Sequence, residues 1–360
     1  MMNRTIFPGY TVGVDAYDDI KNICPAYGKK AAIIGGERAL KAAADKIIAA
    51  CKEAGMEVIG PFWYGGEASY KNVDKLEPKA ADADMIFAVG GGKAIDTGKA
   101  LAHRTKRPFF TFPTIASTCA SCTSLAIMYN PDGSLDQYEF SKIPANHIFI
   151  NTQIIAEAPD RYLWAGIGDT MAKHFECTIS SRNDIPSHSD AMGIALSSMC
   201  ADPIIRWGEK AMSDCKNNQV SYELEEVILG IIISTGFVSN FVQVDYTTGL
   251  AHAIYNGFTM VDSVEHNGHL HGEIVSYGIL VMLTIDKQFD KRDELYRFSR
   301  SIGLPTRLAD IDATVDDLPT VTKKALSGID VRVFPYTVTD EMIVKGVVDM
   351  EAYDAEHRND

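Results

Sequence analysis

The sequence predicts a two-domain protein, with an α/β Rossmann-like domain over residues 1–155 and an all-helical domain over residues 156–360. Three observations support this prediction. Strand-like and helix-like segments alternate in the first half, and an apolar run at 85–89 leads directly into three glycines and a new helix. Beyond Asn151, apolar residues recur mostly at helical spacing, so the boundary is placed where the period changes.

The first half contains five predicted strands that are joined mainly by helices. The strands are expected at residues 30–35, 56–59, 85–89, 109–112 and 147–151, and the helices at 37–54, at 68–80 and from Lys93 onward. Alternating strands and helices imply right-handed crossovers, which build a parallel sheet covered by helices on both faces. This half is therefore expected to be a doubly wound nucleotide-binding domain.

A β-hairpin is expected inside this domain. Residues 125–129 and 135–140 flank the turn sequence Asn130-Pro131-Asp132-Gly133. Each of these four residue types favours a tight turn for a known backbone reason, so the prediction has a mechanism as well as a pattern.

The turn Gly90-Gly91-Gly92 is suited to bind a diphosphate. Glycines let an anion approach the backbone closely, and the N–H groups and positive dipole end of the following helix face that anion. Lys93, Asp96 and Lys99 follow at helical spacing. The pattern is neither the G-x-G-x-x-G fingerprint nor a Walker A loop, and an ordinary strand-to-helix turn is the alternative interpretation.

Composition excludes several classes of partner. The chain has 360 residues, of which 46% are hydrophobic and 23% charged, as in soluble proteins with two full-sized cores. Its net charge of −14 argues against nucleic acid and against an anionic membrane surface, because both attract basic patches. The first ten residues lack the apolar core of a signal peptide, and no apolar run reaches the roughly 18 residues of a membrane span. We expect a cytoplasmic protein that acts on a small molecule.

The seven cysteines are expected to be reduced thiols. Their number is odd, and they are scattered through the chain rather than arranged as a disulfide framework. Cys119 and Cys122 form a C-x-x-C, but no second pair completes a zinc knuckle, and the motif lies in a loop rather than at a helix start. Metal binding or redox chemistry at this pair is the less favoured alternative.

Polar residues in the second half suggest a metal site. Asp169 follows Gly166-Ile167-Gly168 at an expected helix start, where a carboxylate serves either as an N-cap or as a ligand. Four of the nine histidines fall within twenty residues, namely His252, His266, His269 and His271. One aspartate and two histidines suit a catalytic divalent metal, because three protein ligands leave a position open for water or substrate.

Five short motifs follow one another along the chain. They are Gly90-Gly91-Gly92-Lys93 with Asp96 and Lys99, Pro113-Thr114-Ile115-Ala116-Ser117-Thr118, Ala165-Gly166-Ile167-Gly168-Asp169, Ala251-His252-Ala253-Ile254, and His271-Gly272-Glu273. With this set the chain resembles the glycerol dehydrogenase branch of the iron-containing (group III) alcohol dehydrogenases over essentially its whole length. The resemblance implies the glycerol dehydrogenase fold, which dehydroquinate synthase shares, together with a nicotinamide cofactor and a divalent metal.

The resemblance also implies roles for individual residues. Asp169, His252 and His271 would be the metal ligands. The diphosphate region would be held by Gly91, Gly92, Lys93 and Asp96, and the rest of the cofactor site would be lined by Thr114, Ser117, Thr123, Leu125 and Tyr129. A Lewis-acidic metal and a hydride-accepting nicotinamide would then interconvert an alcohol and a carbonyl compound.

Three departures from the family pattern affect the expected chemistry. Lys173 stands where iron-type members have a fourth, histidine ligand, so zinc is favoured over iron. Tyr255 replaces a histidine thought to lie near the nicotinamide, and its phenol hydroxyl would have to pass any proton. Cys119 replaces an aspartate that faces the polyol, as in the hydroxycarboxylate dehydrogenase subgroup.

These departures favour a 2-hydroxy or 2-oxo carboxylate as substrate, with glycerol as the alternative. Cys119 removes a charge that would repel a carboxylate, and Lys173, one helical turn after Asp169, could supply a cation. A dehydroquinate synthase-like cyclase and a non-catalytic nucleotide-binding protein remain as further alternatives. We also expect a homo-oligomer.

The cofactor is expected to be NAD(P)(H), with NADP(H) slightly favoured. The family has an aspartate after the first strand that contacts the adenosine ribose. Here the strand ends in Gly35-Gly36, so the aspartate position is expected to be glycine, and Arg38 could pair with a 2′-phosphate. Glu37 is the alternative acid, because a shift of one residue would restore the carboxylate.

Overall fold

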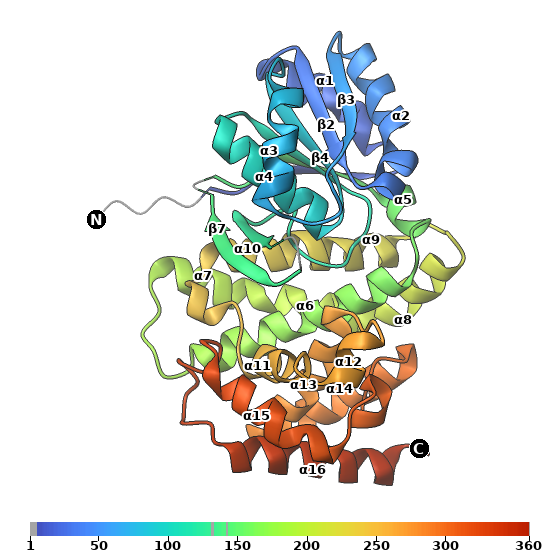
Figure 1. Cartoon of the computed structure of the whole chain (residues 1–360). Helices are drawn as coiled ribbons and strands as arrows, with labels where there is room; N and C mark the ends of the chain where they lie inside the picture. Colours follow the sequence, from blue (N-terminus) through green and yellow to red (C-terminus); the bar gives the residue numbers. More distant parts are fainter. Residues whose placement is uncertain (1–5, 131–132, 142, 360) are drawn as a thin grey trace. The chain divides into compact units, whose positions relative to one another are not determined.

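The computed structural model describes residues 6–130, 133–141 and 143–359, which form two compact units (Figure 1). The first unit contains the described residues up to Tyr162 together with Ser213–Asn240. The second contains Leu163–Met212 and the described residues from Phe241 onward. The predicted boundary at 155/156 lies within the first unit, close to its end at Tyr162, and residues 213–240 of the expected helical half group with the nucleotide-binding fold.

A six-stranded parallel sheet forms the centre of the first unit, in the order β1-β8-β5-β4-β2-β3. Its strands are β1 (Gly9–Gly13), β2 (Lys30–Gly35), β3 (Glu57–Trp63), β4 (Met85–Gly90), β5 (Phe109–Pro113) and β8 (His147–Asn151). The five predicted strands are all present. The sequence pattern missed β1, which lies at the sheet edge with mostly half-exposed residues and so lacks a continuous apolar run.

Helices cover both faces of this sheet. The apolar side chains of one face, among them Phe87, Phe112 and Phe149, form a single core with Ile47 of α2 (Glu37–Glu53). On the opposite face Gly98 of α4 (Gly92–Thr105) packs so closely that a Cβ atom there would lie 2.6 Å from Ala88 Cβ. The other helices of this unit are α1 (Ile20–Ile23), α3 (Tyr70–Leu76), α5 (Thr152–Ala156), α9 (Tyr222–Leu229) and α10 (Thr235–Phe241).

The predicted hairpin consists of β6 (Leu125–Tyr129) and β7 (Leu135–Phe140), which pair in antiparallel register. Asn130 N–H donates to the Ser134 carbonyl at 2.8 Å, and Gly133 adopts a positive φ of 89°. Pro131 and Asp132, the two other predicted turn residues, lie outside the described residues.

One stretch of the first unit has the composition of a membrane span. Residues Tyr222–Phe241 run from α9 through a π-helical segment into α10, with a mean hydropathy of 1.4 over their most apolar window. No apolar run of membrane-spanning length was expected here, because Glu225 and Glu226 interrupt the apolar residues. More than half of the window, 56%, is buried inside the protein, as in a core helix of a globular fold.

The second unit is built from helices. They are α6 (Arg161–Ser180), α7 (His188–Leu196), α8 (Asp202–Lys216), α11 (Leu250–Phe258), α12 (Asp262–His266), α13 (His271–Ile285), α14 (Phe289–Ile302), α15 (Leu318–Ser327) and α16 (Asp340–His357). Helix α13 is apolar on nearly all sides and packs against α11, α14 and α16, so it forms the centre of this unit.

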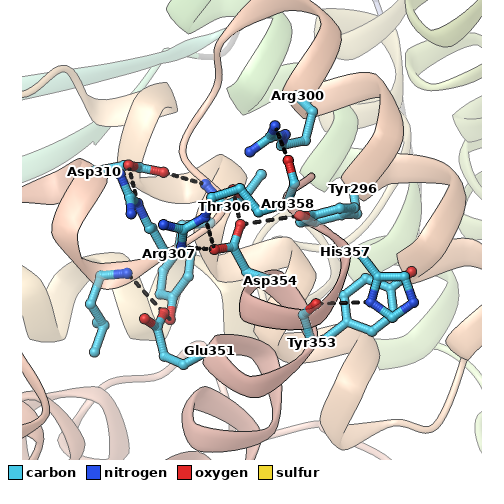
Figure 2. A network of polar contacts seen from close by, with 12 residues as sticks. Tyr296, Arg300, Thr306, Arg307, Asp310, Glu351, Tyr353, Asp354, His357 and Arg358 are labelled. Atoms are coloured by element: carbon cyan, nitrogen blue, oxygen red, sulfur yellow. Dashed lines mark hydrogen bonds and ion pairs between the residues drawn. The ribbon is translucent and has the colours of Figure 1, made fainter. Parts of the chain in front are cut away.

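A polar network attaches the C-terminal helix α16 to the rest of this unit (Figure 2). The fully buried Asp354 accepts hydrogen bonds from Thr306 Oγ1 at 2.7 Å and Tyr296 OH at 3.2 Å, and it pairs with Arg358. Glu351, one turn earlier, accepts from the Leu308 N–H at 2.8 Å and from a tyrosine hydroxyl. Figure 2 also shows Arg300 reaching the end of the same helix, where it donates to the Arg358 carbonyl.

Candidate metal centre and cofactor pocket

Three helices of the second unit bring Asp169, His252 and His271 together. One ligand atom from each residue lies within 4.8 Å of the other two. Asp169 Oδ1 is 3.4 Å from His252 Nε2 and 3.3 Å from His271 Nε2. One carboxylate oxygen and two imidazole nitrogens that converge on a single point form a donor set suited to a divalent metal, and the partly exposed His271 leaves one side open.

Asp169 lies in the middle of α6, so the expectation that it starts a helix is wrong. The glycines before it are not helix breakers here, because they allow close packing against α13. A Cβ atom on Gly168 would lie 2.3 Å from the Gly272 carbonyl oxygen, and one on Gly272 would lie 1.9 Å from the Ala165 carbonyl oxygen. The N-cap alternative for Asp169 is thereby removed, and the close crossing of the two helices is what brings Asp169 near His271.

Glu176 holds His252 from the side away from Asp169. This carboxylate is completely buried; its Oε1 accepts the His252 N–H at 2.9 Å, and its Oε2 lies 2.7 Å from His252 Nδ1. This residue was not among those predicted from the sequence. The available signal was its position seven residues after Asp169, which places both carboxylates on one face of α6.

Neighbouring charged groups determine the direction in which the pKa values of His252 and Asp169 shift. Burial lowers the pKa of His252, but the carboxylates of Glu176 and Asp169 outweigh that effect and raise it to about 10. Burial raises the pKa of Asp169, and the two imidazoles more than offset this and hold it well below its usual range. A proton and a metal ion therefore compete for the same His252 nitrogen.

Two other predicted residues lie in this unit. The ring of Tyr255 packs edge-on against His271, with ring centroids 4.2 Å apart. Lys173 is buried, and its ammonium group donates to the backbone carbonyl of Thr247. The cation that was expected to face a substrate carboxylate is thus engaged in an internal hydrogen bond.

The remaining clustered histidines have structural partners instead. His266 is exposed and its Nδ1 contacts the Asp262 carbonyl at 2.7 Å. His269 lies between Glu273 Oε1 at 2.8 Å and Asp312 Oδ2 at 2.9 Å. Since Glu273 also accepts the N–H of Leu270, this group fixes the start of α13, which carries His271.

The first unit contains a cavity of about 790 Å³ at the carboxyl ends of β2 and β4. The strand order reverses between these two neighbours, and such switch points are where open α/β sheets bind nucleotides. The lining includes the glycine-rich turn, the start of α2, the end of β3 and the segment after β8. These residues include Gly36, Glu37, Arg38, Trp63, Tyr64, Gly90, Gly91, Gly92, Lys93, Thr114, Ile154 and Tyr162.

The predicted cofactor residues fall into two groups. Gly91, Gly92, Lys93 and Thr114 line the cavity, whereas Ser117, Thr123, Leu125 and Tyr129 are not among its described lining residues. Tyr129 still lies beside Lys93, whose ammonium group is 5.4 Å from the tyrosine ring centre and 2.7 Å from Glu67 Oε2. Trp63, Tyr64 and Tyr162 were missed, because nothing in their local sequence distinguishes them from core aromatic residues.

Asp96 is turned inward rather than into the cavity. Its Oδ1 lies 3.0 Å from the ammonium group of Lys99, its Oδ2 accepts the Ile127 N–H at 3.2 Å, and both side chains are buried. Lys99 also donates to the Ala120 carbonyl at 2.9 Å. The pair therefore ties α4 to the loop and hairpin that follow β5.

Cys119 and Cys122 lie in that loop of the first unit, and neither forms a disulfide. The Cys122 N–H donates to the Cys119 carbonyl at 2.9 Å, as in a turn, and Cys122 is fully buried against Gly236. Burial raises the pKa of the Cys122 thiol. Cys119 is the more accessible of the two.

Comparisons with known proteins identify the family of the chain. The family model of iron-containing alcohol dehydrogenase matches residues 8–149. The chain is 31% identical to glycerol dehydrogenase of Thermotoga maritima over 345 residues, covering 90% of each protein. It is also 31% identical to hydroxycarboxylate dehydrogenase A of Escherichia coli K12, covering 91% of this chain and 90% of that one.

The fold agrees as well. The crystal structure of glycerol dehydrogenase from Schizosaccharomyces pombe superimposes with a TM-score of 0.87 at 26% identity, covering 99% of this chain and 92% of that one. The sequence relatives are oxidoreductases that act on CH–OH groups. This chain therefore belongs to the iron-containing alcohol dehydrogenase family and is an alcohol-type oxidoreductase of its glycerol dehydrogenase-like branch.

Proposed function

We propose that this protein is a metal- and nicotinamide-dependent dehydrogenase that interconverts a small polyol of the glycerol type and its carbonyl form. The observation that carries the proposal is the convergence of Asp169, His252 and His271 within 4.8 Å. These residue types suit a catalytic divalent metal, and the chain's relatives include glycerol dehydrogenases.

Zinc is the metal we propose, held by Asp169, His252 and His271. Support comes from position 173, where a lysine bonded to a backbone carbonyl stands instead of a fourth imidazole ligand. Two histidines and a carboxylate also bind Fe(II) in other proteins, so the metal content of the purified protein is the test. Iron that remains bound at one equivalent while zinc is absent would contradict the zinc assignment.

When both groups are bound, the chemistry available is Lewis-acid polarisation of the substrate oxygen and hydride exchange with the nicotinamide. Asp169, His252 and His271 would hold the metal, and the hydroxyl of Tyr255 is the proposed proton carrier. Gly91, Gly92, Lys93 and Thr114 orient the cofactor, since the N–H groups and the ammonium group offer donors to a diphosphate.

For the cofactor, we propose that the enzyme accepts NADP(H) at least as well as NAD(H). Both Glu37 and Arg38 line the cavity beside Gly36, so one acid and one base face the same region. Arg38 could pair with a 2′-phosphate, which Glu37 would repel. In steady-state kinetics, Arg38→Ala should lower kcat/KM for NADP(H) about tenfold or more and change that for NAD(H) little. A strong preference of the parent enzyme for NAD(H) would contradict this assignment.

Two observations favour a polyol over the 2-oxo carboxylate that the sequence motifs suggest. Glycerol dehydrogenases recur among the relatives, and the ammonium group of Lys173 is buried in a bond to Thr247 rather than offered to a substrate. A 2-hydroxy or 2-oxo carboxylate remains the second candidate, because Cys119 lacks the negative charge of the family's aspartate and one relative is a hydroxycarboxylate dehydrogenase.

Substrate preference is tested by measuring kcat/KM for glycerol and for 2-oxobutanoate in the parent enzyme and in Cys119→Asp. Glycerol should be preferred in the parent. At an effective dielectric constant near 20, like charges about 4–5 Å apart cost roughly 3–4 kcal/mol, so Cys119→Asp should shift the ratio towards glycerol by about two to three decades. Cys119→Ser, which adds no charge, is the matched control. A parent enzyme that prefers 2-oxobutanoate would refute the polyol assignment in favour of the second candidate.

We also propose that the enzyme is cytoplasmic and homo-oligomeric. Its seven cysteines form no disulfide, which suits a reducing compartment, and its acidic composition gives no basis for a membrane or nucleic-acid partner. Light scattering coupled to size-exclusion chromatography tests the second point, and a mass of 39.4 kDa would show a monomer.

A further inference from the structure

Beyond the three convergent ligands, we infer that Glu176 is a positioning residue, which sets the tautomer and the orientation of His252 for metal binding. This inference rests on the proposed metal centre. It starts from the fact that both oxygens of a completely buried carboxylate are used by a single residue, through the backbone N–H and the imidazole Nδ1 of His252.

The tautomer follows from hydrogen-bond chemistry. An ionised carboxylate only accepts hydrogen bonds, so Glu176 Oε2 at 2.7 Å requires the proton on His252 Nδ1. In the neutral ring that binds a metal, the lone pair is then on Nε2, the atom that lies 3.4 Å from Asp169 Oδ1 and faces the ligand cluster. Imidazole ligands of metals commonly donate their second N–H to a carboxylate in this way, which fixes the ring and increases its basicity.

The orientation follows from the second hydrogen bond. His252 lies in the first turn of α11, where backbone N–H groups have no partner within the helix. Glu176 Oε1 accepts this N–H at 2.9 Å, so one carboxylate holds the backbone and the side chain of His252 together.

Gly249 makes the close approach of α6, which carries Glu176, and α11, which carries His252, possible. It precedes α11, and a Cβ atom at this position would lie 3.1 Å from Glu176 Cγ and 3.2 Å from its Cβ. A larger residue would press on the side chain that holds His252. The missing Cβ atom of Gly249 therefore leaves room for the Glu176 side chain.

Glu176→Gln separates this role from a purely structural one. If the glutamine oxygen keeps the bond to the His252 N–H, its amide group faces Nδ1 and donates to it. That contact moves the proton to Nε2 and leaves no lone pair towards Asp169 and His271, although the fold retains its hydrogen bonds. Loss of a carboxylate of this kind typically weakens metal binding 10- to 100-fold.

Glu351→Gln is the matched control. Glu351 is a carboxylate of the same unit that also accepts one backbone N–H, from Leu308, and one side-chain donor, the hydroxyl of Tyr277. It contacts none of the three ligands in these bonds. Glu351→Gln therefore shows how much zinc affinity changes when a carboxylate with similar hydrogen bonds is replaced and His252 is left untouched.

The experiment measures zinc affinity by competition with a chromogenic chelator in the parent, Glu176→Gln and Glu351→Gln proteins. We expect Glu176→Gln to bind zinc 10- to 100-fold more weakly and Glu351→Gln to bind within twofold of the parent. Equal zinc affinity in Glu176→Gln and the parent overturns the positioning role. Absence of zinc binding in the parent would instead refute the proposed metal centre, so the two failures are distinguishable.

A second measurement keeps the inference testable if Glu176→Gln does not fold. In the zinc-loaded parent enzyme, proton NMR should show a downfield resonance from an imidazole Nδ1–H bonded to a carboxylate, assigned to His252 with 15N-labelled histidine. A His252 ring that carries its proton on Nε2 in that spectrum overturns the inference whatever the variant does.

Discussion

At the scale of single residues, the proposed centre depends on three side chains that the sequence separates by 19 to 102 positions. His252 contacts Asp169 on one side and Glu176 on the other. With two ligands left, a divalent ion would be bound far more weakly, whereas the surrounding helices would keep their apolar contacts.

The first prediction concerns this histidine. His252→Ala should abolish turnover and release the metal, while the far-ultraviolet circular dichroism spectrum stays that of the parent. Metal content measured by mass spectrometry and the rate of nicotinamide reduction check both effects. His266→Ala, an exposed histidine of the same region, should behave like the parent. A metal-free His252→Ala protein with full activity would disprove the assigned ligand role.

At the scale of secondary-structure elements, the crossing of α6 and α13 decides where two of the ligands lie. Gly168 and Gly272 face each other there, and backbone atoms of one helix occupy the space of the missing side chain on the other. The absence of two Cβ atoms is therefore a condition for the short distance between Asp169 and His271.

The second prediction concerns this crossing. Gly272→Ala places a methyl group 1.9 Å from the Ala165 carbonyl oxygen, so the two helices must separate. We expect a loss of about 2–3 kcal/mol in the free energy of unfolding, measured with urea, together with weaker metal binding. In Gly328→Ala the nearest atom is the flexible Asp330 carboxylate at 3.1 Å, so this control should cost less than about 0.5 kcal/mol. Equal stability of the two variants would contradict this account.

At the scale of the whole molecule, the net charge is −14, so the dependence of folding stability on pH shows how much the acidic groups contribute. The network around Asp354 joins α14, the segment at Thr306 and the C-terminal helix α16 (Figure 2). Burial raises the pKa of Asp354, but the hydrogen bonds from Arg358, Thr306 and Tyr296 outweigh this and hold its pKa below the usual range.

The third prediction follows from the sign of that shift. A carboxylate whose pKa is lower in the folded state stabilises the protein above its unfolded pKa of about 3.9, and this contribution disappears as the pH falls through the lower, folded value. Asp354→Asn should cost about 3 kcal/mol at pH 7, because the substitution breaks a buried charge network. The difference from the parent should shrink below about pH 4.

Urea unfolding at several pH values measures this dependence. Asp349→Asn, on the same helix, removes an exposed pair with Lys345 and should change stability by less than about 0.5 kcal/mol at any pH. A constant difference between Asp354→Asn and the parent from pH 7 to pH 3 would show that the charge of Asp354 does not contribute.

The local sequence pattern was sufficient to predict most secondary-structure elements and the family. The strands β2, β4, β5 and β8 and the helix α2 follow from the period of their apolar residues, because that period depends only on neighbours along the chain. Spaced motifs were likewise sufficient to predict the family, which the comparisons confirm. The edge strand β1 was missed, since it is half exposed and carries no continuous apolar run.

Only the tertiary structure shows which residues that are distant in sequence bond to each other. Lys173 bonds to Thr247 and Glu176 to His252, across 74 and 76 positions, and no local pattern records either contact. Asp96 turned out to face Lys99 and the Ile127 N–H rather than the cofactor cavity, because a buried carboxylate must be paired where it lies. The sequence by itself determined which elements form and which chemistry they carry, whereas helix packing decided which charges meet and which remain free to act.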